Sequence, residues 1–304
     1  PEGLTHMGTT VRDTNLYTDL LQEAISGELA GMDVLYGSRA AVVQMTLPRN
    51  GPNGPYKGGD KVVVPYFDFV GELEDLAESG ALTPSALTST NEEASIVHSG
   101  KAGEVTSWAQ MAASVGDPYG EYAKQFARAF KRRIERALLS AAITSLPSTN
   151  ILDITGEASP GIGRNPLLRA QALWGDEQSG IVLMSMHSKV YFDALQLVDS
   201  SGQPIFKEIV EAGPNGGEAI RKLNGIPVAI SDLNTKSGTT YSTLLFKEAA
   251  LAAWVNGAPI VKGDSDILAD TEVTAIHAYH VAHRYKRRPG WTLPGVIKLQ
   301  TTQA

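Results

Sequence analysis

The chain has 304 residues, 42% of them hydrophobic, and a net charge of −7, so it can fold around a packed core and is not a typical basic DNA-coating protein. It has no cysteine, which excludes disulfides, thiolate metal sites and cysteine nucleophiles. The sequence shows neither an apolar run of about 18 residues nor a signal-peptide pattern, so the cytoplasm is the expected compartment.

The first hundred residues predict one helix and two strands. Leucines at helical spacing predict an amphipathic helix over 14–31. Strands are predicted near 61–70 and 93–102, and Pro65 makes the first an edge strand or a bulge because proline cannot donate to a ladder. The acidic, Ser/Thr-rich stretch 71–92 lies between them and predicts a long extended loop.

A long helix is predicted over 118–146. Asp117 is a favourable N-cap, Pro118 fits the first helical position, and Pro147 stops the helix. At 100° per residue one side of this helix is an apolar stripe, which predicts that it packs on a core; the stripe consists of Tyr119, Tyr122, Ala123, Phe126, Phe130, Ile134, Ala137 and Ala141.

The opposite side of the same helix carries a basic ridge of five residues: Lys124, Arg128, Lys131, Arg132 and Arg136. Like charges four residues apart repel, so the ridge favours external anions. These could be phosphates or acidic groups of a neighbouring subunit, and a simple solvated face is the alternative. Specific base readout is not supported, because no helix-turn-helix spacing surrounds the ridge.

Short helices and strands follow without clean βαβ alternation, which predicts an α+β fold. A helix is predicted from Asn165 as N-cap to Gly175 as stop. Strands are predicted in "GIVLMS", "GIPVAISD", "YSTLLF" and "ALAAWVNG", and the chain closes in β structure through "TEVTAIHAYHVAHRYKR" and "GWTLPGVIKLQ".

No catalytic or cofactor motif is present. The sequence lacks a phosphate-binding loop, a G-x-S-x-G elbow and an H-E-x-x-H pair. On the strand predicted there, His277 and His283 share one face about 20 Å apart and His280 faces the other way, so they cannot hold one ion. Asp264, Asp266 and Asp270 lack the pattern of a calcium loop and suggest a charged turn or subunit contact. We therefore expect no enzyme, no metal and no cofactor.

The order of these features resembles the major capsid proteins of tailed double-stranded-DNA phages, with the Hong Kong 97-type fold. An N-terminal arm, a long two-stranded loop, a Trp-containing segment, one long helix and a mixed region ending near "PGVIKL" follow one another. The resemblance rests on "GDKVVVPYFDF", "ESGALTPSALTS", "ASIVHSGKAGEVTSWAQ", "DPYGEYAKQFARAFKRRIERALLSA", "IPVAISD" and "LLFKEAALAAWV". These segments span most of residues 50–304.

The resemblance implies a layout: an N-terminal arm at 1–48, an extension loop at 49–104, a peripheral domain at 105–149 and 265–304, and an axial domain at 150–264. It implies a structural subunit whose hexamers and pentamers build an icosahedral shell around double-stranded DNA. The ridge would face the inner surface. The extension loop would contact a neighbouring subunit, with Tyr66, Phe67, Glu72, Glu74 and Asp75 as candidate contacts.

The implied partners are other copies of the chain, a scaffolding protein, a portal, a decoration protein, and packaged DNA bound without sequence specificity. A separate scaffolding protein or cleavage before Pro1 is expected. The chain would be a virion component assembled in the host cytoplasm. Two alternatives stay open: an encapsulin-type nanocompartment shell, which has the same fold, and a soluble nucleic-acid-binding regulator.

Overall fold

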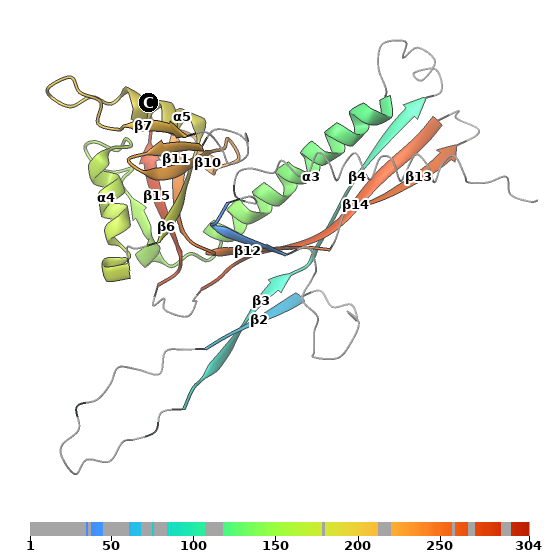
Figure 1. The fold of residues 1–304 in the computed structure, drawn as a ribbon, viewed down its shortest axis with the longest axis horizontal. Helices are drawn as coiled ribbons and strands as arrows, with labels where there is room; N and C mark the ends of the chain where they lie inside the picture. The colour runs from blue at the N-terminus through green and yellow to red at the C-terminus, as the bar shows by residue number, and fades with distance from the viewer. Residues whose placement is uncertain are drawn as a thin grey trace, which may run out of the picture.

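The computed structural model confirms the α+β class, with two mixed sheets, a separate ribbon and a few helices (Figure 1). It describes residues 35, 38–44, 61–67, 75, 84, 86–106, 118–177, 180–211, 220–256, 259–266, 271–286 and 293–303. The predicted helix at 14–31, the cap Asp117 and the contact candidates Glu72 and Glu74 lie outside these residues. No described helix is both long and apolar enough to cross a membrane.

The first sheet has five strands built around the long strand β14 (Thr271–Arg284). Three strands pair antiparallel with it: β4 (Val97–Thr106), β12 (Leu251–Val255) and β13 (Ile260–Asp266). The fifth strand, β1 (Ala41–Gln44), lies parallel to β12. The long helix α3 (Pro118–Ile143) runs beside β14 and β4 in Figure 1 and packs on the sheet through its apolar stripe.

The second sheet has eight strands and carries two helices, α4 (Arg164–Ala172) and α5 (Ser188–Gln196), packed against it. Two 3₁₀ turns, η1 (Ser148–Asn150) and η2 (Gly175–Glu177), lie near it in sequence. Its strands are β5 (Ile151–Asp153), β6 (Ile181–Met186), β7 (Glu208–Glu211), β8 (Ile220–Leu223), β9 (Ile226–Ile230), β10 (Lys236–Ser237), β11 (Thr240–Lys247) and β15 (Val296–Thr302).

A two-stranded ribbon projects from the body of the molecule (Figure 1). It consists of β2 (Lys61–Phe67) antiparallel to β3 (Ser89–Ser95), and one residue separates β3 from β4. Pro65 sits opposite Asn91 in this pair. Both strands of a two-stranded sheet are edge strands, so the edge-strand prediction for Pro65 is confirmed.

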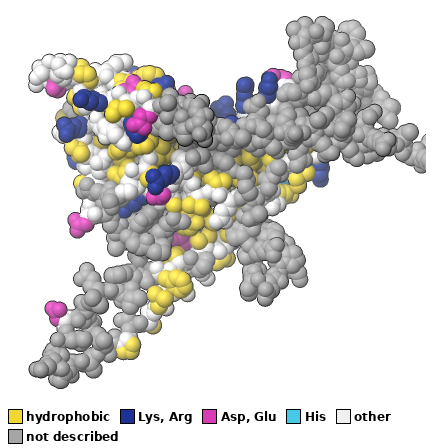
Figure 2. All heavy atoms as spheres, viewed as in Figure 1, with side chains coloured by type: hydrophobic (Ala, Val, Ile, Leu, Met, Phe, Trp, Pro, Cys, Tyr) yellow, Lys and Arg dark blue, Asp and Glu magenta, His cyan; other side chains and the backbone are white. Residues whose placement is uncertain are grey.

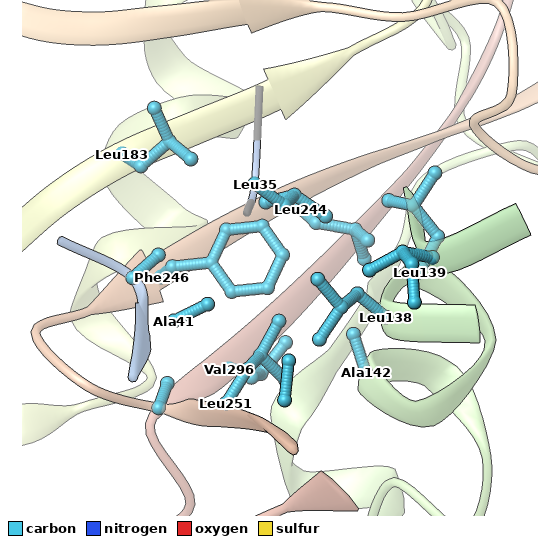
Figure 3. Packing of buried hydrophobic residues seen from close by; sticks show 14 of the residues in the cluster. Leu35, Ala41, Leu138, Leu139, Ala142, Leu183, Leu244, Phe246, Leu251 and Val296 are labelled. Atoms are coloured by element: carbon cyan, nitrogen blue, oxygen red, sulfur yellow. The ribbon is translucent and has the colours of Figure 1, made fainter. Parts of the chain in front are cut away.

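The main core lies where α3 meets both sheets. Phe246 of β11 is buried among Leu138 of α3, Leu251 of β12 and Val296 of β15, and Leu35 packs there as well (Figure 3). The same apolar cluster therefore contains residues from the long helix and from each sheet, and it joins the two halves of the molecule.

Helix boundaries differ from prediction at two places. The long helix begins at Pro118 as predicted but ends at Ile143, because Ser145 takes a left-handed conformation with φ of 53° and stops the helix before Pro147. The prediction of Asn165 as an N-cap is wrong. The helix α4 begins earlier, after Gly163, and no side chain caps it.

Strand pairing differs from the sequence-based expectation in two segments. Asp264 and Asp266 lie in β13, opposite Val273 and Thr271, and not in a turn, because the β13–β14 hairpin extends through them. The expected boundary between the axial and peripheral domains, near residue 264, does not coincide with a change from one sheet to the other. The strands β12 and β13 belong with β14 and β4, whereas β15 is hydrogen-bonded to β11 and β5 in the other sheet.

The junction core predicts a measurable cost for one truncation. Leu138→Ala should lower the free energy of unfolding by about 2–5 kcal/mol, because Leu138 is fully buried in the shared cluster. The matched control is Leu168→Ala on α4, where the side chain is 50% exposed and the loss should be about 0.5 kcal/mol or less. Urea unfolding of the purified variants measures both; equal losses would contradict the assignment of the junction core.

Candidate functional site

The basic ridge lies on the exposed side of α3, and its residues Arg132 and Arg136 also border the space between the helix and β4. Lys124, Arg128, Arg132 and Arg136 are exposed, and Lys131 is half-buried. Figure 2 shows Lys and Arg side chains projecting from the upper edge of the molecule beside α3. The separation follows from helical periodicity, because Phe126, Ala127, Phe130, Ile134 and Leu138 take the buried positions.

Four residues of the ridge carry positive charge that no described residue neutralises. Lys124, Arg128, Arg132 and Arg136 form no ion pair within the part of the chain that the structure describes. On α3, Glu121 accepts a hydrogen bond from Gln125 at 3.2 Å, and the buried Glu135 accepts one from the backbone N–H of Leu35 at 2.9 Å.

A groove of about 540 Å³ opens beside this ridge, between α3 and β4. Its floor is apolar and its walls are basic. Arg133 Nε donates a hydrogen bond to Ser99 Oγ across the groove at 3.2 Å. The groove is lined by His98, Ser99, Gly100, Lys101, Phe126, Ala129, Phe130, Arg132, Arg133, Arg136, Ile276 and Ala278. The sequence alone could not show that β4 supplies the facing wall of this groove.

The contact candidates on the extension loop are partly described. Tyr66 is half-buried, Phe67 is 63% exposed at the end of β2, and Asp75 is exposed. Val63 and Leu87 are also exposed, and apolar side chains line the ribbon in Figure 2. Large apolar side chains on a projecting ribbon are typical of a surface that another chain covers.

A buried polar pair fixes the base of the ribbon to the five-stranded sheet. His283 Nε2 of β14 donates to Glu92 Oε2 of β3 at 2.6 Å, and both side chains are almost fully buried. Glu92 Oε1 also accepts from the backbone N–H of Lys286 at 3.0 Å. The rings of Trp254 and Tyr285 flank His283. Sequence analysis missed this pair, because Glu92 looks like any residue of an acidic loop.

The alternation predicted for the histidines is confirmed, since β14 places His277 and His283 on one face and His280 on the other. His277 Nδ1 lies 3.2 Å from His98 Nε2 of β4, and His98 also stacks on Tyr279. Among the described residues, no three His, Asp or Glu side chains converge as metal ligands.

His280 differs from its neighbours because it has no polar partner. It is 1% exposed, and neither ring nitrogen hydrogen-bonds to a described residue. Burial, and then the nearby positive charge of Arg133, lower the pKa of His280 to about 4. The imidazole is therefore neutral at pH 7 and serves as part of the packing under α3.

This arrangement of elements matches solved capsid structures along nearly the whole chain. The capsid of an empty GTA particle aligns with a TM-score of 0.64 and 11% identity, over 100% of this chain and 95% of that one. The capsid of the native GTA particle aligns at 0.63 and 12%, with the same coverage. The capsid of Ralstonia phage GP4 aligns at 0.59 and 11%, over 87% of each chain.

The chain has the fold of phage capsid proteins. No family model and no curated protein matches its sequence, so the likeness is one of structure. At 11–12% identity the similarity covers the arrangement of the helices and strands and does not extend to individual side chains. The descriptions of the basic ridge, the groove and the base of the ribbon therefore rest on this chain alone.

The buried pair of Glu92 and His283 at the base of the ribbon leads to a testable prediction. A carboxylate accepts from both His283 and Lys286, whereas a glutamine has one acceptor oxygen, so Glu92→Gln leaves one buried donor unpaired at a cost of about 1–3 kcal/mol. Amide exchange in β2 and β3 should become faster. In the control Glu93→Gln, which alters an exposed pair with Lys61, exchange should stay unchanged. Identical exchange in both variants would show that Glu92 does not hold the ribbon.

The buried imidazole leads to a prediction about pH. Between pH 6.5 and about 4 the unfolded chain binds a proton at His280 that the folded chain does not bind, so stability falls as pH falls through this window. The loss is about 1.4 kcal/mol per pH unit at most. His280→Leu should flatten this dependence relative to His277→Leu, which changes a half-exposed histidine. Parallel curves for the two variants in urea unfolding at pH 4–7 would contradict the prediction.

Proposed function

We propose that the chain is a major capsid subunit that assembles as hexamers and pentamers into an icosahedral shell around double-stranded DNA. The observation that carries the proposal is the alignment of the whole chain with capsid subunits of assembled particles. The projecting ribbon supports it, because the exposed apolar side chains of a two-stranded ribbon are stabilised when another molecule covers them. The proposed role is structural and not catalytic.

The proposed layout follows the Hong Kong 97-type plan. Residues 1–48 form the N-terminal arm and 49–104 the extension loop, whose described strands are β2, β3 and most of β4. The peripheral domain is built on α3, from 105–149 and 265–304, and the axial domain from 150–264. Strand pairing suggests one refinement: β12 and β13 go with the peripheral sheet and β15 with the axial sheet.

The proposed partners follow from that role. Copies of the chain contact one another through the extension loop, with Tyr66, Phe67, Glu72, Glu74 and Asp75 as candidates. A scaffolding protein, a portal and a decoration protein are the expected companions in a particle assembled in the host cytoplasm. The finished location is the virion.

The basic ridge suits packaged DNA. Exposed Lys124 and Arg128 form no ion pair with described residues, and such charges bind phosphates without reading sequence. Because the whole chain carries a net charge of −7, attraction to DNA depends on local basic surface such as the ridge and not on the overall charge.

Microscopy of the purified protein tests the proposal. We expect negative-stain images to show closed icosahedral particles, and nuclease-treated particles made in the presence of the packaging machinery to absorb strongly at 260 nm. Closed particles that carry protein and no nucleic acid would favour the encapsulin-type shell. A small oligomer that binds duplex DNA with steep salt dependence would overturn the capsid proposal in favour of a regulator.

A further inference from the structure

The groove between α3 and β4 is lined by charges of one sign. Arg132, Arg133 and Arg136 of α3 and Lys101 of β4 line it, and none of the described lining residues is Asp or Glu. Residues three or four apart on a helix are neighbours, so Arg136 lies beside both other arginines on the surface of α3. A cleft lined by charges of one sign concentrates ions of the opposite sign, so this groove attracts anions.

These positive charges have few partners within the protein. Neither Arg132, Arg136 nor Lys101 forms an ion pair with a described residue. Arg133 donates through Nε to Ser99 Oγ at 3.2 Å and makes no other hydrogen bond or ion pair with the described part of the chain. A guanidinium has five N–H donors, so four donors of Arg133 remain for a ligand.

The strand β4 supplies donors from the opposite side of the groove. Ser99 and Lys101 are alternate residues of this strand and therefore point to the same face. They lie opposite Ala278 and Ile276 of β14, which also line the groove. Because Ser99 Oγ accepts from Arg133, its own hydrogen can be donated to an oxygen atom in the groove. Guanidinium, ammonium and hydroxyl donors together suit the oxygens of phosphate groups.

The apolar residues under the groove offer little surface to a ligand. Phe126, Phe130 and Ile276 are only 4%, 7% and 5% exposed, because they are already packed between the helix and the sheet. An apolar ligand would therefore gain little from covering them. Charge, and not apolar contact, selects what binds here.

Size and charge together indicate a compact anion with several phosphates. The groove has a volume of about 540 Å³, which is enough for a small ligand. One phosphate group carries a charge of about −1.5 to −2 at pH 7 and offsets about two of the four cations, so two or three linked groups are needed. A DNA duplex carries its phosphates along the outside of a wide cylinder, so it meets the exposed Lys124 and Arg128 and does not enter the groove.

We propose that the groove between α3 and β4 binds a free polyphosphate anion of two or three linked phosphate groups. Arg132, Arg133 and Arg136 bind the phosphate oxygens from the helix, and Ser99 and Lys101 bind them from the strand. The anion pairs charges that otherwise repel one another and links α3 to β4. The site lies within one subunit and does not depend on shell assembly.

Isothermal titration calorimetry of the purified protein with sodium tripolyphosphate tests the site. We expect one tripolyphosphate per chain, bound about tenfold or more weakly by Arg133→Gln with Arg136→Gln, because charge-assisted hydrogen bonds are lost. The matched control, Lys124→Gln with Arg128→Gln, removes the same charge outside the groove and should change the affinity about twofold or less. Equal losses in the two variants, or sulfate binding as tightly at the same ionic strength, would overturn the proposal.

Chemical protection of Lys101 tests the site without any substitution. Saturating tripolyphosphate should slow the acetylation of the exposed Lys101 about fivefold or more, because a phosphate covers its ammonium group. Acetylation of the exposed Lys124 should keep its rate. Mass spectrometry of the two peptides measures both rates. An unprotected Lys101 would overturn the proposal, and this result decides if circular dichroism shows that a substituted chain does not fold.

Competition with duplex DNA identifies the source of the phosphates. A duplex oligonucleotide should leave the protection of Lys101 by tripolyphosphate unchanged, because it binds the ridge at Lys124 and Arg128. Displacement of tripolyphosphate by the duplex would show that the groove takes DNA phosphates and would overturn the assignment to a free anion. Protection of Lys101 in a protein that binds no DNA would support the groove site and contradict the proposed DNA contact of the ridge.

Discussion

The helix α3 holds the molecule together because its apolar side packs on two sheets at once. Leu138 and Phe130 belong to the same buried cluster as Phe246 of the eight-stranded sheet and Leu251 of the five-stranded sheet. A helix buried along one side must expose the other, so the burial that joins the sheets also turns Arg128 and Arg132 outward. The core and the basic ridge are thus two results of one periodic pattern.

The position of α3 also creates the groove. Because Phe126 and Ala127 pack on Val261 and Ile276, the flank of the helix that carries Arg133 is held opposite β4. The helix supplies apolar and basic lining residues of this groove, and β4 closes the facing side and adds Lys101.

The ribbon is attached to the five-stranded sheet at its base. Glu92 and His283 form a buried hydrogen bond between β3 and β14, and Val62 and Ala94 add an apolar cluster around Trp254. Because the Glu92 and His283 side chains are both buried, water cannot replace their hydrogen bond. The pair therefore favours one orientation of the ribbon, in which the two groups remain bonded. A ribbon held in this way presents its exposed apolar side chains in a defined direction.

Local pattern in the sequence determined the elements that depend on neighbours a few residues away. The amphipathic long helix from Pro118, its exposed basic ridge, the edge strand at Pro65 and the alternating histidines of β14 all follow from periodicity and backbone chemistry. Only the tertiary structure decided the contacts between distant segments: Glu92 with His283, Arg133 opposite Ser99, and β15 in the sheet of β11 rather than that of β14. The start of α4 was misjudged because Gly163 gives no side-chain signal for a cap. Pairing between strands and burial of polar groups depend on which segments meet in space, and a single sequence does not encode that in any local pattern.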